Sequence, residues 1–143
     1  VGFDIDLLIR FAQEKGYKIN INNMNFDAVI PSLQTTCNIA ASGITKTDER
    51  SEAVLFSEAY HSTDAVMMVK KPVSKAKRIT SFGQLKAPGV RLGIQTGSFS
   101  ESVAMNHFPK AERKYFASVP DMVSALEADH RWFCLPGCCC RIY

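Results

Sequence analysis

The sequence predicts an α/β protein built from two small lobes connected by a hinge. Apolar residues recur at helical spacing in some segments and alternate in others, and the two kinds of segment follow each other along the chain. This order favours parallel-rich sheets covered by helices. A polar, proline-containing stretch from Lys70 to Lys77 interrupts the order once, as a linker would. We therefore place lobe one at residues 1–70 and lobe two at residues 71–143.

Lobe one begins with a predicted helix. Its apolar residues recur at helical spacing, namely Ile5, Leu8, Ile9 and Ala12. Gly16 is placed to end that helix. A strand is predicted over Tyr17–Ile21, where apolar and polar residues alternate, and a second helix over Asp27–Leu33. Pro31 is tolerable only in the first turn of that second helix. A short buried strand over Ile39–Ser42 follows.

Lobe two repeats the alternation of helices and strands. A strand over Asp64–Val69 leads into the polar stretch. The elements expected after it are a short helix over Ser81–Leu85, a strand over Val90–Ile94, a helix from Gly97 through Ala104, a strand over Lys114–Ala117 and a helix over Pro120–Leu126. Pro120 suits the start of the last helix, because a first-turn residue needs no backbone N–H.

Composition excludes several classes of protein. The chain is 46% hydrophobic and 22% charged, which is typical of a globular protein with a core. The net charge is +3 and the basic residues are scattered, so we expect no nucleic-acid partner. No apolar run approaches the ~20 residues that a membrane helix needs. The sequence opens inside a helix start, so we expect the gene product to begin upstream and its precursor to carry a signal peptide.

The five cysteines do not form a disulfide framework. Cys37 stands alone, and the others crowd the tail at Cys134 and Cys138–Cys140. Together with His130 the tail cysteines offer metal-ligand chemistry. However, three adjacent cysteines cannot easily all point at one ion. We therefore expect no metal site and no cofactor.

The stretch from Ser42 to Arg50 carries the most chemistry. It follows a predicted strand, and α/β folds place ligands at the carboxyl ends of their strands. Gly43 allows close backbone approach, Thr45 offers a hydroxyl, and Arg50 offers a planar fork that matches a carboxylate. The residues alone leave an equal alternative, in which Arg50 is a surface residue paired with a neighbouring acid, Asp48 or Glu49, and Thr47 caps a helix.

Five stretches then occur in the order of a known family. They are Gly2–Leu7, Phe26–Gln34, Ser42–Arg50, Phe56–Tyr60 and Arg91–Ser98. Together they resemble the family 3 extracellular solute-binding proteins, the periplasmic receptors of polar amino-acid ABC transporters. The resemblance covers residues 2 to about 129. It implies a periplasmic binding protein-like fold of two hinged α/β lobes, here incomplete at both ends.

In lobe one the resemblance implies a ligand site built mainly on one loop. Ser42 opens the family's ligand loop, and Gly43 matches a position whose backbone carbonyl accepts from the ligand ammonium. Thr45 matches the hydroxyl residue that contacts carboxylate and ammonium. Arg50 matches the arginine that pairs with the α-carboxylate, and Phe26 matches an apolar residue that packs on the ligand side chain.

In lobe two the implied site residues are Gly97, Ser98 and Phe99. They match a loop whose N–H groups meet the ligand carboxylate at a helix N-terminus, where the helix dipole favours an anion. Asp4 and Asp6 are prominent in the first motif, and the resemblance gives them a structural role.

The chain also departs from the family. The first strand of lobe one would precede Val1, and the turn at Gln34–Asn38 is shorter than usual and lacks the family's aspartate. The tail from His130 onward has no family character, which suggests a truncated or frameshifted gene. On this interpretation the ammonium-binding aspartate of the return crossing is lost.

The expected function is extracytoplasmic binding of a polar amino acid for delivery to the membrane permease of an ABC transporter. The expected location is the periplasm or the cell surface, where a lipoprotein form is also compatible. The alternative is a ligand-sensing domain of a signalling receptor or of a cell-wall enzyme. An enzyme of this fold, such as a dehydratase, needs a general acid or base, and no histidine has a partner at catalytic spacing. We therefore expect no catalytic residues.

Overall fold

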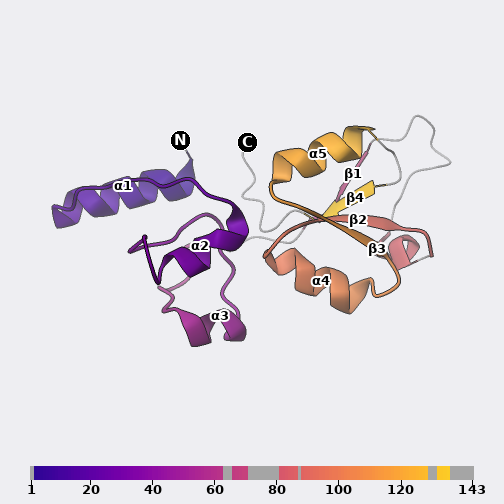
Figure 1. Cartoon of the computed structure of the whole chain (residues 1–143), viewed down its shortest axis with the longest axis horizontal. Coiled ribbons are helices and arrows are strands. Elements are labelled where there is room, and N and C mark those ends of the chain that lie inside the picture. Colours follow the sequence, from indigo (N-terminus) through magenta and orange to yellow (C-terminus); the bar gives the residue numbers. More distant parts are fainter. Residues whose placement is uncertain (1, 63–65, 71–80, 87, 129–131, 136–143) are drawn as a thin grey trace. The chain divides into compact units, whose positions relative to one another are not determined.

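The computed structural model describes residues 2–62, 66–70, 81–86, 88–128 and 132–135 (Figure 1). The chain forms two compact units, residues 1–60 and 61–143. The second unit therefore begins before the polar stretch that the sequence suggests as a linker, most of which lies outside the described residues. The lobe boundary at residues 70 and 71 stays a prediction.

The described part of the first unit contains three helices. They are α1 (Phe3–Lys15), α2 (Phe26–Ser32) and α3 (Asp48–Ala53). The predicted first helix is confirmed, and it ends at Gly16, whose φ of 70° is left-handed. The Gly16 N–H donates to carbonyls of the last turn, which otherwise lack partners. A residue with a Cβ would be strained at this φ.

The second helix departs from expectation in one respect. Pro31 lies in its last turn and not in its first. The missing N–H removes one hydrogen bond, and the helix ends one residue later at Ser32. The Ser32 hydroxyl donates to the Val29 carbonyl at 2.6 Å, and the Leu33 N–H donates to the Ile30 carbonyl at 3.1 Å. These short-range bonds close the helix after the proline.

The two strands predicted in lobe one are wrong. Tyr17–Ile21 and Ile39–Ser42 are neither helical nor paired in the structure. A strand needs a neighbour for its backbone donors and acceptors, and the described residues of the first unit offer these segments none. Ile39, expected in a buried strand, is 54% exposed. Alternation of side chains predicted an extended backbone but could not supply a partner.

The second unit is built on a four-stranded sheet in the order β1-β4-β2-β3. Its elements are β1 (Met68–Val69), the 3-10 helix η2 (Phe82–Lys86), β2 (Arg91–Gln95), α4 (Phe99–His107), β3 (Glu112–Phe116), α5 (Val119–Ala128) and β4 (Trp132–Leu135). Strand β2 runs parallel to both β3 and β4, and β1 is antiparallel to β4. The predicted alternation is confirmed here, with ends that differ by a few residues.

Strand β4 lies in the tail, where the sequence analysis expects no family character. Residues 132–135 pair with β2 along Arg91–Ile94. Backbone pairing places few demands on side-chain identity, so an apolar stretch can complete the sheet without a recognisable motif. The proposed metal ligands His130 and Cys138–Cys140 lie outside the described residues.

Strand β2 holds the core of the second unit. Its side chains Leu92 and Ile94 are fully buried. They pack with residues from η2, α4 and the loop before β3, namely Leu85, Ala104, Phe108 and Ala111. A second cluster joins Met122 and Leu126 of α5 to Phe116 of β3. Figure 1 shows α4 and α5 on opposite sides of the sheet, so each cluster fills one face.

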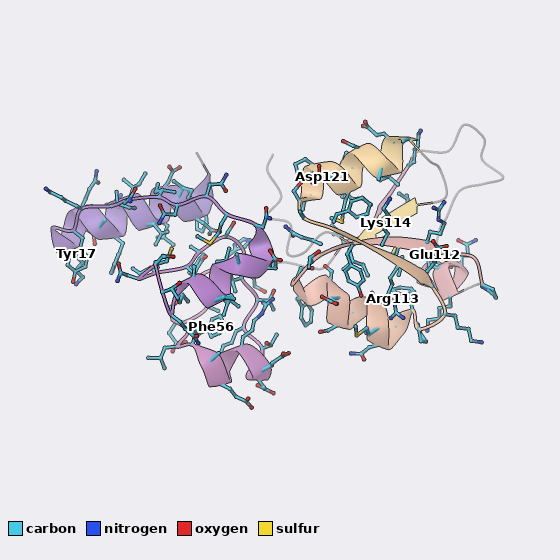
Figure 2. The ribbon with its side chains drawn as sticks, in the orientation of Figure 1. Tyr17, Phe56, Glu112, Arg113, Lys114 and Asp121 are labelled. Atoms are coloured by element: carbon cyan, nitrogen blue, oxygen red, sulfur yellow. The ribbon has the colours of Figure 1, made fainter. Side chains whose placement is uncertain are left out.

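Strand β3 forms one edge of the sheet. Glu112, Arg113 and Lys114 follow one another along it, and all three are exposed (Figure 2). Charged side chains on an edge strand discourage pairing with another chain. This edge therefore protects the sheet against association.

The buried α5 face supplies the first prediction. Met122→Ala should lower the free energy of unfolding of the second unit by about 2–5 kcal/mol, because Met122 is 0% exposed and its removal leaves a cavity. Met105→Ala on α4 is the matched control, since Met105 is 49% exposed. Urea unfolding followed by circular dichroism measures both. Equal losses in the two variants would contradict the assignment of this core.

Candidate ligand-binding site

The loop before α3 has an unusual backbone. Ser42 has a φ of 149° and Gly43 a φ of 63°. The second value is ordinary for glycine, whereas the first is rare for a residue with a side chain. Such a conformation persists only where surrounding contacts hold it, and it is often found at binding sites. The contact that holds this loop is a hydrogen bond from the Gly43 N–H to Oδ2 of Asp4, at 2.9 Å.

The N-terminus of α3 is capped by Thr47. Its Oγ1 accepts from the Arg50 N–H at 3.2 Å, and its carbonyl accepts from the Ser51 hydroxyl at 2.8 Å. The side-chain bond satisfies one of the N–H groups that a helix leaves without an internal partner. The predicted capping role of Thr47 is therefore confirmed.

Arg50 is half-buried and its side chain turns back toward the loop. Its Nη1 donates to the Thr45 carbonyl at 2.7 Å. This bond brings together two residues that the sequence analysis assigns to a carboxylate site. A guanidinium has five N–H donors, and the bond to Thr45 fixes the plane in which they lie. Phe26 is also half-buried, but it stands on a separate helix, as the first residue of α2.

In the second unit, Gly97, Ser98 and Phe99 form the junction between β2 and α4. Gly97 has a φ of 71°, which turns the chain after the strand. Ser98 is the N-cap of α4 and only 4% exposed. In the described part of the chain its Oγ is a buried polar atom without a hydrogen-bond partner. The junction is held from the side by Thr96, whose N–H and Oγ1 both donate to the Phe116 carbonyl, at 3.0 and 3.2 Å.

This junction has the chemistry of an anion site. Helix N-termini present N–H groups and the positive end of the helix dipole to a ligand. A buried hydroxyl without a partner costs free energy unless something binds it. Each unit thus offers donors suited to a carboxylate, namely Arg50 in the first and the start of α4 in the second.

Comparison with known proteins identifies the family. The model of the bacterial extracellular solute-binding proteins, family 3, matches residues 1–134. The chain belongs to this family. The match includes most of β4, which places that strand inside the family's pattern.

Two curated relatives show the extent of the similarity. The probable histidine-binding protein of Neisseria gonorrhoeae is 34% identical over 88% of this chain and 46% of its own length. The arginine-binding extracellular protein ArtP of Bacillus subtilis (strain 168) is 31% identical over 90% of this chain and 49% of its own length. The chain spans about half the length of these relatives.

Solved structures show the same fold. An ancestral amino acid-binding protein, AncCDT-1, described as a precursor of cyclohexadienyl dehydratase, superimposes with a TM-score of 0.85 at 33% identity. The match covers 95% of this chain and 60% of that one. An ancestral arginine-binding protein bound to glutamine gives a TM-score of 0.81 at 31% identity, over 95% and 59% of the two chains. The expected periplasmic binding protein-like fold is therefore confirmed.

Sequence reasoning missed the contacts that hold the ligand loop of this solute-binding protein. Asp4 accepts from Gly43, 39 residues away, and its Oδ1 accepts from the Tyr60 hydroxyl at 3.0 Å, 56 residues away. The resemblance assigned Asp4 a structural role but gave it no partner. Both motifs were recognised separately, and nothing in their spacing indicates that they touch.

Cys37 lies outside the proposed ligand residues and carries a free thiol. Hydrogen bonds from the side chains of Ser32, Asn22 and Thr36, in that order of size, lower the pKa of this thiol from its ordinary value. Because the pKa is depressed on folding, these bonds favour the folded state above the unfolded pKa, and that effect is lost as pH falls through the lowered value.

Neither a metal cluster nor a membrane span occurs in the part of the chain that the structure describes. Its His, Cys, Asp and Glu residues form no group of three that could hold a metal ion. Its helices include none long and apolar enough to cross a bilayer.

The cap of α3 supplies the second prediction. Thr47→Ala should destabilise α3 by about 1 kcal/mol, because the Arg50 N–H loses its acceptor. Thr47→Ser keeps an acceptor in place and serves as the control. Hydrogen exchange of the Val54 amide, which donates to the Arg50 carbonyl at 3.0 Å, reports the opening of the helix. The cap assignment fails if the alanine and serine variants exchange at the same rate.

Proposed function

We propose that this chain is the ligand-binding part of an extracytoplasmic receptor that captures a polar amino acid and delivers it to the membrane permease of an ABC transporter. The observation that carries the proposal is the Arg50–Thr45 bond, which holds a half-buried guanidinium beside a hydroxyl residue. This arrangement occurs in a member of a solute-binding family. A guanidinium fixed in this way suits bidentate binding of an α-carboxylate.

In this proposal each part of the zwitterion has its own partner. Arg50 pairs with the carboxylate and the Thr45 hydroxyl contacts carboxylate and ammonium. The Gly43 carbonyl accepts from the ammonium, in the loop that Ser42 opens, and Phe26 packs on the ligand side chain. The start of α4, at Gly97, Ser98 and Phe99, adds donors to the carboxylate when the lobes close. Closure excludes water, so these charge-assisted bonds strengthen.

The names of relatives suggest where to look first for the ligand. Curated relatives are named as arginine- and histidine-binding proteins, and one solved ancestral arginine-binding protein holds glutamine. We therefore propose a polar amino acid as the ligand class, with the basic amino acids to be tested first. Ligand capture of this kind belongs outside the cytoplasm, in the periplasm or at the cell surface, including a lipoprotein form.

Binding without catalysis fits the described residues better than an enzyme does. AncCDT-1 is described as a precursor of a dehydratase, so an enzyme on this fold is the natural competitor. A dehydratase needs a general acid or base in its site. The described histidines, His61 and His107, are exposed and belong to neither of the proposed ligand loops. The sensory domain of a receptor or of a cell-wall enzyme stays the alternative function.

The third prediction concerns the proposed carboxylate partner. In the full-length gene product, Arg50→Ala should weaken amino-acid binding by about 2–5 kcal/mol, because a desolvated carboxylate loses its charged partner. Thr45→Val should cost less, roughly 1–3 kcal/mol, since a single hydrogen-bonding group is removed. Isothermal titration against the twenty amino acids measures both effects.

Arg10→Ala is the matched control for the loss of an arginine. Arg10 lies on α1 with its side chain 81% exposed, and it pairs with Glu14. Its replacement should leave the affinity unchanged. If Arg50→Ala binds as Arg10→Ala does, Arg50 is a surface residue and the proposed carboxylate site is wrong.

A further inference from the structure

Asp4 joins three separate parts of the first unit. It lies in the first turn of α1, and its two carboxylate oxygens accept from different segments. Oδ2 accepts from the Gly43 N–H at 2.9 Å, and Oδ1 accepts from the Tyr60 hydroxyl at 3.0 Å. Hydrogen bonds to an ionised carboxylate are stronger than those between neutral groups. One side chain therefore connects the helix start, the proposed ligand loop and the last residue of the unit.

A second contact supports the same junction. The ring of Phe3 stacks on the ring of Tyr60, with centroids 6.1 Å apart and an interplanar angle of 30°. Adjacent residues of α1 thus hold the ring and the hydroxyl of Tyr60. Because the ring contact restricts Tyr60, its hydroxyl is positioned against Asp4 at a reduced entropic cost.

The bond to Gly43 acts on the strained part of the loop. It fixes the peptide unit between Ser42, whose φ is 149°, and Gly43. A residue with a side chain leaves such a conformation unless a specific contact opposes it. The Gly43 carbonyl and Thr45 follow directly in the chain, so the orientation of this peptide unit sets where they lie.

We infer that Asp4 is a positioning residue for ligand binding: it holds the loop from Ser42 to Thr45 in its binding conformation through the Gly43 N–H, and it anchors that loop to Tyr60. This inference rests on the proposed function of the loop. It separates Asp4 from Asp6, which the resemblance treats alike. Asp6 also lies in the first turn of α1, but it is exposed.

Asp6 therefore provides a matched control. Asp4→Ala and Asp6→Ala each remove one acidic residue from the same helical turn, so both lose the same favourable interaction with the helix dipole. Asp4→Asn keeps the size of the side chain and an acceptor oxygen but removes the charge, and Asp6→Asn is its counterpart. Tyr60→Phe removes the hydroxyl and retains the ring that stacks on Phe3.

Two measurements on the full-length gene product test the inference. The first is hydrogen exchange of the Gly43 amide without ligand, which reports the bond to Asp4 directly. The second is isothermal titration with the amino acid that the wild-type protein binds. We expect Asp4→Ala to accelerate Gly43 exchange and to weaken binding about tenfold or more, the change expected when a loop-ordering hydrogen bond is lost. Asp4→Asn should give a smaller loss and Tyr60→Phe a few-fold loss, and both Asp6 variants should match the wild type.

The outcomes separate this inference from the proposed function. If the wild-type protein binds an amino acid and Asp4→Ala binds it as well as Asp6→Ala does, the positioning role is wrong and the proposed function stands. If Gly43 exchange accelerates without any loss of affinity, Asp4 is purely structural and the inference is equally wrong. A wild-type protein that binds none of the twenty amino acids overturns the proposed function itself. Should Asp4→Ala not fold, Asp4→Asn against Asp6→Asn decides by the same two readouts.

Discussion

Backbone pairing around β2 is the constraint on which the second unit depends. Strand β2 has a parallel neighbour on each side, β3 and β4, so its backbone groups are satisfied along its whole length. Its side chains can therefore point into two packed faces, and Leu92 and Ile94 become fully buried. The loop between β2 and α4 leaves from the end of this fixed strand. The proposed anion site at Ser98 thus inherits its rigidity from the sheet.

The first unit is held by a different kind of contact. Among its described residues only Ala12 and Ser32 are buried, and α1 exposes Phe3, Leu7 and Phe11 along one side. A unit with so little buried apolar surface gains little from the hydrophobic effect. Specific polar contacts carry more of its organisation, and the two bonds to Asp4 are the longest-range of these. The proposed ligand loop of this unit therefore depends on a few hydrogen bonds.

The sequence predicted local elements well and pairing poorly. Helical spacing and a terminal glycine located α1, and the capping threonine located the start of α3. The strands expected at Tyr17–Ile21 and Ile39–Ser42 did not form, and β4 formed where no motif indicated it. Helices satisfy their backbone internally, so a local pattern suffices. A strand needs a partner from elsewhere in the chain, and spacing alone carries no information about that partner.

The candidate site divides in the same way. The sequence by itself determined the family, the order of its motifs and the residue types of the ligand loop, because each motif is a short contiguous stretch. Only the tertiary structure decided that Arg50 turns back to the Thr45 carbonyl and that Asp4, and not Asp6, reaches the loop. Asp4 and Asp6 look equivalent along the chain. They differ because a helix rotates about 100° per residue, so two residues in one turn face different surroundings.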